Sequence, residues 1–196
     1  MSHRILNLPR TLVVAVGVLT LAAAPAAFCQ ALNSNTASVS LTATLNESLT
    51  VAATPSAVTF ALVSGGTATG SAPVAMTTTW VMNASRATVT LTGYFSSATA
   101  ALTSGGSSPV NIPTSEVLGQ VTTGAPTTYT AFTQTPATGG VGVTGASLVL
   151  VSQAITAANR ASTRSDNLNL EINLASQTQL PAGTYTGTLN LQAQAL

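Results

Sequence analysis

The stretch TYTGTLNLQAQA, residues 184–195, decides the fold because its apolar and polar residues alternate along its whole length. One side carries Tyr185, Leu189 and Leu191, and the other side carries threonine, asparagine and glutamine. Side chains on a β-strand point alternately to its two faces, so this pattern predicts a strand with one buried face. The Pro-Ala-Gly sequence just before it, residues 181–183, predicts a turn.

The same period of two recurs through the rest of the chain and predicts an all-β protein. Gly, Pro and Ser separate the runs, and only residues 154–160 offer even a single turn of helix. Residues 83–86 predict a tight hairpin connection. Eight to ten short strands in one chain predict a single antiparallel Ig-like β-sandwich. The other alternating runs are residues 39–45, 49–53, 58–62, 72–83, 87–95, 116–121, 129–132, 147–151 and 168–174.

The N-terminus has the features of an export signal. Arg4 and Arg10 precede an apolar run over residues 12–27, and small residues surround Cys29. A basic start, an apolar middle and a small-residue end are typical of a secretory signal peptide. We therefore expect a cleaved signal over residues 1–31 and a sandwich domain over residues 32–196, with no transmembrane segment after cleavage. The expected location is extracellular, at the cell surface or in the periplasm.

The scarcity of charge and of reactive side chains limits the chemistry. Only nine of 196 residues are charged, which is 5%, against about 25% in an average soluble domain. Residues 32–196 contain no His, Cys or Lys. A Ser or Cys nucleophile usually needs a nearby base such as His or Lys, and zinc sites need His or Cys. We expect no catalytic residues, cofactor, metal or nucleic acid, although Glu47 and Glu116 remain an alternative carboxylate pair if they meet in space.

Three other groups of residues have both a functional and a structural interpretation. The irregular region 96–147 is rich in loops, where binding sites concentrate. Tyr129 and Phe132 are its candidate ligand patch for a glycan or a host surface, and core packing is the simpler account. The cluster of Arg160, Arg164 and Asp166 is either a recognition loop or a loop ordered by salt bridges. Trp80 lies in phase with apolar neighbours, so it is expected in the core.

Both ends of the domain resemble a known group of exported proteins. Residues 179–195, QLPAGTYTGTLNLQAQA, resemble the closing strand of bacterial pilin-like sandwiches of the spore coat protein U type. Residues 38–51, SVSLTATLNESLTV, are similar to the opening of secreted adhesin-like domains. Coat U-type domains usually carry cysteines, and residues 32–196 contain none. The resemblance implies an exported, non-catalytic structural or adhesive surface protein, such as a fimbrial subunit.

The resemblance also implies partners. In such proteins a neighbouring subunit donates a strand that fills an apolar groove, a form of β-strand addition. Residues with the donor pattern are Val39, Leu41, Ala43 and Leu45. The expected partners are copies of this chain or related subunits. The alternative is that residues 39–45 pair within their own domain, and the sequence leaves both open.

Overall fold

The computed structural model describes residues 32–196, and the predicted signal peptide lies outside the described residues. The chain divides into two units, Met1–Thr42 and Ala43–Leu196. The second unit is all-β, and its strands pair antiparallel, as the alternating runs predict. Within the described residues, no helix is long and apolar enough to span a membrane.

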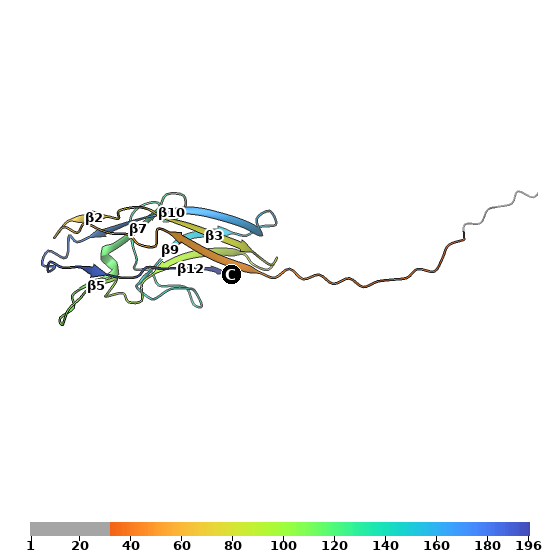
Figure 1. Ribbon diagram of the computed structural model, residues 1–196, viewed down its shortest axis with the longest axis horizontal. Helices are drawn as coiled ribbons and strands as arrows, with labels where there is room; N and C mark the ends of the chain where they lie inside the picture. Colours follow the sequence, from red (N-terminus) through yellow and green to blue (C-terminus); the bar gives the residue numbers. More distant parts are fainter. Residues whose placement is uncertain (1–31) are drawn as a thin grey trace, which may run out of the picture. The chain divides into compact units, whose positions relative to one another are not determined.

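Three sheets make up the unit Ala43–Leu196. The largest has the order β1-β3-β10-β7-β8, with β2 paired to β10; the second is β12-β4-β9, and the third is β11-β5-β6. Figure 1 shows β2, β7, β10 and β3 along one side of this unit and β5 and β12 along the other. The strand bounds are β1 Ser48–Thr54, β2 Thr67–Thr69, β3 Val74–Val81, β4 Thr88–Tyr94, β5 Leu102–Ser104, β6 Asn111–Ile112, β7 Val117–Val121, β8 Thr130–Ala131, β9 Ser147–Ala154, β10 Ala161–Asn173, β11 Tyr185–Thr186 and β12 Asn190–Ala195. A short 3₁₀ helix, η1, covers Thr114–Glu116.

The core forms where the apolar faces of the strands meet. On β3 the side chains alternate between buried and more exposed, with Met76 and Trp80 on the buried face. Leu168 and Ile172 of β10 and Leu150 of β9 are fully buried in the same cluster as Met76. Trp80 lies in a second, smaller cluster with Met82 and Val89. Burial of apolar surface is the main favourable term in folding, so this shared face determines which side of each strand points inward.

Two predicted connections differ in the structure. Residues 83–86 do form a tight turn, since the Arg86 N–H donates to the Asn83 carbonyl over 3.2 Å. The turn joins β3 to β4, which belong to different sheets, so the hairpin prediction is wrong. Residues 154–160 form no helix; Thr156 to Asn159 make a turn between β9 and β10, closed by the Asn159 side chain.

Three segments with a strand pattern do not pair as predicted. Residues 39–45 have no strand assignment. Residues 58–62 contain one isolated bridge, between Phe60 and Gly70. The closing run is interrupted at residues 187–189, between β11 and β12. A strand needs a neighbour to satisfy its backbone groups, and within the described chain these segments have no complete neighbour. Pairing of residues 39–45, within their own domain or with a neighbour, stays a prediction.

Candidate functional site

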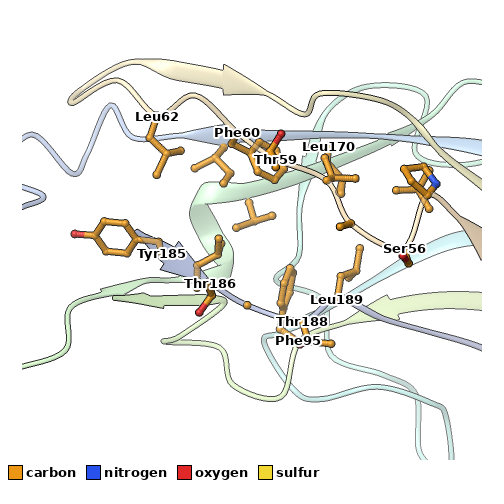
Figure 2. Close-up of a pocket in the computed structure, with 18 of the residues that line it drawn as sticks. Ser56, Thr59, Phe60, Leu62, Phe95, Leu170, Tyr185, Thr186, Thr188 and Leu189 are labelled. Atoms are coloured by element: carbon orange, nitrogen blue, oxygen red, sulfur yellow. The ribbon is translucent and has the colours of Figure 1, made fainter. Parts of the chain in front are cut away.

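An apolar groove of about 720 Å³ runs between two of the segments that fail to pair. Residues 53–62 form one wall and residues 183–191 form the other. Figure 2 shows Phe60 and Leu62 on the upper side, and Leu189 and Phe95 on the lower side. No charged residue lines the groove. The floor consists of Val74, Phe95, Leu102, Val117, Leu170 and Ile172.

Both walls carry free backbone groups. Within residues 32–196, the main chain of residues 187–189 makes no backbone hydrogen bond, and neither does that of residues 56–58. Gly187 and Thr188 are exposed, as are Ser56 and Ala57. An edge with unpaired N–H and C=O groups is a template for an added strand. The groove therefore offers an apolar floor between two such edges.

Pro55 on one wall and Gly187 on the other have local roles that their chemistry explains. Pro55 directly follows β1, and proline has no N–H to continue a ladder, so pairing with β3 ends at Thr54. On the other wall, Gly187 passes directly against the Ala101 carbonyl, where a Cβ would collide with the backbone. A close approach of two backbones is a position that glycine alone can occupy. Pro55 thus ends the ladder of the first wall, and Gly187 allows the second wall to pass close to Ala101.

The predicted donor residues lie in a segment that is exposed in the described chain. Val39 is 81% exposed, Leu41 90% and Leu45 85%. Ala43 is exposed as well. Exposed apolar residues are common singly, but here they repeat every second residue over one extended run. The structure thus leaves a complete apolar strand face uncovered.

We call residues 32–46 the arm. An ion pair fixes the point where the arm joins β1. Glu47, the residue before β1, accepts hydrogen bonds from Arg86 Nη2 over 3.0 Å and from the Asn83 N–H over 2.8 Å. Arg86 Nη1 also donates to the Ala195 carbonyl over 3.4 Å. The hydrogen bond from Arg86 is the main reason that the pKa of the Glu47 carboxyl is lowered. The arm therefore starts at a defined point beside the end of β12.

The candidate ligand patch does not come together at the surface. Phe132 is fully buried and packs edge-on against Phe95, with ring centroids 5.3 Å apart. Tyr129 is 36% exposed. Phe132 is thus a core residue and cannot contact a surface ligand. Of the two interpretations of Phe132, core packing is the one that the structure shows. Trp80 is also in the core, and its indole N–H donates to the Asn159 carbonyl over 2.8 Å.

Arg164 and Asp166 belong to β10, so the loop prediction is wrong for them, whereas Arg160 precedes the strand and is exposed. The predicted salt bridge is present between Arg164 and Asp166. Arg164 and Asp166 lie on the inner face of β10, with Asp166 6% exposed. Arg164 Nε donates to Asp166 over 2.7 Å, and its other nitrogens reach the Thr123 carbonyl and the Gln153 side chain. Burial raises the pKa of the Asp166 carboxyl, but the hydrogen bonds from Arg164 and Thr123 outweigh it, and the pKa is lowered. Gln153 belongs to β9, so the cluster ties two sheets together.

The two carboxylates that were the alternative catalytic pair are engaged separately. Glu47 binds Arg86, as described above. Glu116 lies at the end of η1 and accepts a hydrogen bond from the Ser176 hydroxyl over 2.5 Å. Each carboxylate therefore has its own partner elsewhere in the fold.

Comparison of the chain with protein-family models, with curated proteins and with solved structures found no match. The argument on function therefore rests on the groove, its two edges and the arm.

Proposed function

We propose that this chain is an exported, non-catalytic structural or adhesive surface protein with an incomplete Ig-like sandwich, and that its groove accepts an added β-strand. The observation that carries the proposal is the coincidence of the groove with two unpaired segments. Residues 58–62 and 184–195 both have the alternation of a paired strand. The unpaired parts of both segments line the same apolar groove. One strand inserted there would pair with both walls.

The chemistry of the groove favours a strand over a small polar ligand. Its walls and floor carry no charged side chain, so there is little to orient a charged or heavily hydroxylated molecule. A β-strand would satisfy the free backbone groups of the walls through main-chain hydrogen bonds, and alternate side chains would fill the floor. The class of ligand is therefore an extended peptide with apolar residues at every second position.

The composition supports the structural side of the proposal. Residues 32–196 contain no His, Cys or Lys. The polar faces of the strands consist mainly of Thr, Asn, Gln and Ser. Charged residues on edges normally guard a sheet against association, and this chain has few. Export rests on the signal pattern of residues 1–31.

Peptide binding tests the groove directly. The probe is a synthetic peptide of residues 37–46, ASVSLTATLN, and the receptor is the complete chain carrying Leu41→Asp, so that its own arm does not compete. The matched control is the same peptide with Leu41 and Thr42 exchanged, which breaks the alternation without changing composition. We expect saturable one-to-one binding of the first peptide only. At a peptide concentration of 100 times Kd, the free energy of unfolding should rise by about 2.7 kcal/mol.

Two results would count against the groove. One is the absence of binding up to millimolar peptide. The other is equal binding of both peptides, because that would show adhesion without use of the alternating face.

A further inference from the structure

The hydroxyl of Thr123 is held by a carboxylate. Thr123 lies in the turn after β7, and its Oγ1–H donates to Asp166 Oδ1 over 2.6 Å. Asp166 is only 6% exposed, and its other oxygen accepts from Arg164 Nε over 2.7 Å. A carboxylate in this position can take the proton of a hydroxyl whose oxygen attacks a carbonyl carbon. Thr123 is therefore a nucleophile with its base already in place.

The same cluster contains a side-chain amide whose carbonyl is polarised. Gln153 belongs to β9, and its Oε1 accepts a hydrogen bond from Arg164 Nη1 over 2.9 Å. A guanidinium at this distance from a carbonyl oxygen stabilises the negative charge that the oxygen gains when the carbon is attacked. Gln153 thus offers an electrophilic carbon and a nitrogen that can leave.

Arg164 gathers the two groups around one guanidinium. Its Nη2 donates to the Thr123 carbonyl over 2.6 Å and to Asp166 Oδ1 over 3.0 Å. Its Nη1 holds the Gln153 side chain. The nucleophile, the base and the amide are therefore all anchored on Arg164. Holding reacting groups in one place gives an intramolecular reaction a large advantage over the same reaction between separate molecules.

We propose that Thr123 and Gln153 join in an intramolecular ester, which the chain forms by itself in a single event. Rotation of the two side chains brings Thr123 Oγ1 to Cδ of Gln153, Asp166 takes the hydroxyl proton, and Arg164 stabilises the oxyanion. The bond from Cδ to Nε2 then breaks, and the nitrogen leaves as ammonia with the proton that Asp166 returns. One C–O bond replaces one C–N bond, no electron is gained or lost, and escape of ammonia into the solvent draws the exchange forward.

The ester ties the turn after β7, in the largest sheet, to β9, in the second sheet. A covalent cross-link stabilises a fold mainly because it restricts the unfolded chain. Disulfides and amides of lysine need Cys or Lys, and residues 32–196 contain neither. A link between a hydroxyl and a carboxamide is one that this composition still allows. None of its residues lines the groove, so the ester and the proposed function stand independently.

Mass spectrometry of the complete chain, exported from a bacterium and incubated at neutral pH, tests the ester. We expect the mature chain to weigh one ammonia less than its sequence. Chymotrypsin digestion of the denatured chain cuts after Phe132, between the two residues, so the fragments that contain Thr123 and Gln153 should be recovered as one linked pair. Mild alkali should separate the pair and convert residue 153 to glutamate, because hydroxide hydrolyses an ester to an acid.

Two substitutions remove the reacting groups. Thr123→Val removes the hydroxyl, and Gln153→Glu replaces the amide with a group that has no ammonia to lose. Each should abolish the mass deficit and the linked pair completely. Thr122→Val is the matched control, because Thr122 is the exposed neighbour, and it should keep both signals. Thr123→Ser retains a hydroxyl and should also keep the linked pair.

The inference is overturned if the mature chain retains the full mass of its sequence after prolonged incubation, because no ester has then formed. It is overturned as well if the deficit persists in Thr123→Val or in Gln153→Glu, since the ammonia then comes from another residue. A mass deficit without a linked pair of fragments leads to the same conclusion.

Discussion

If residues 39–45 add to the groove of a neighbouring copy, as the resemblance implies, replacing Leu41 by alanine should weaken assembly while leaving the folded domain unchanged. Leu41 is 90% exposed in the single chain, so nearly its whole side chain is available for burial in a neighbour's groove. Burying a leucine side chain stabilises by about 1.5–3 kcal/mol. Truncating it also leaves a void, which brings the cost to about 2–3 kcal/mol.

That cost converts to a measurable change in affinity. At 1.4 kcal/mol for each factor of ten, the dissociation constant between copies should rise about 30- to 150-fold. Sedimentation or single-molecule mass measurement over a dilution series gives this constant. Thr42→Ala is the matched control, because Thr42 lies one residue further on the opposite face. A change at such a position should stay within about 0.5 kcal/mol.

Two results would refute the reasoning. If Leu41→Ala and Thr42→Ala weaken assembly equally, the alternating face does not mediate the contact. If Leu41→Ala lowers the melting temperature of the dissociated monomer, Leu41 contributes to its own domain and the exposed arm is not the relevant state.

Three further predictions concern the domain itself. Gly187→Ala should destabilise the domain by about 1–3 kcal/mol in denaturant unfolding, because the added methyl meets a backbone carbonyl. The control is Gly183→Ala, where a Cβ meets nothing and the change should stay within about 0.5 kcal/mol. Equal effects of the two substitutions would contradict the close contact at Gly187. Asp166→Asn should cost about 2 kcal/mol by leaving Arg164 partly unpaired. Because the folded pKa of Asp166 is lowered, the contribution of its carboxylate is present above about pH 4 and is lost as the pH falls toward the folded value, so the difference between Asp166→Asn and the unchanged chain should shrink in acid. Trp80→Phe should cost about 1 kcal/mol, since a buried hydrogen bond to a carbonyl is lost, and an unchanged unfolding midpoint would contradict that contact.

The alternation of side chains predicts the strands well where both the pattern and a partner are present. β3, β4 and β12 lie within predicted runs, and β1 extends one residue beyond its predicted run at each end. Pairing is harder to predict because it depends on residues far apart in sequence. Residues 83–86 predict a hairpin between the strands on either side. In the structure β3 pairs with β1 and β10, and β4 pairs with β12 and β9.

The charged residues of β10 show a different limitation. Arg164 and Asp166 have the same parity as Leu168 and Leu170, so the signal for an inward-facing pair was present in the sequence. Charged residues favour a loop in a sequence-based prediction because burying a charge is costly. Here the two charges neutralise each other and receive further hydrogen bonds, which makes burial tolerable.

The sequence by itself determined that this chain builds antiparallel strands, that residues 39–45 have an apolar face, and that residues 32–196 lack the side chains of common catalytic and metal sites. Only the tertiary structure decided which of those strands find partners. Pairing of β1 ends before Pro55, and residues 187–189 stay outside the ladders of β11 and β12. The physical reason is that alternation is a local property, whereas a completed ladder requires a second strand at the right place in space.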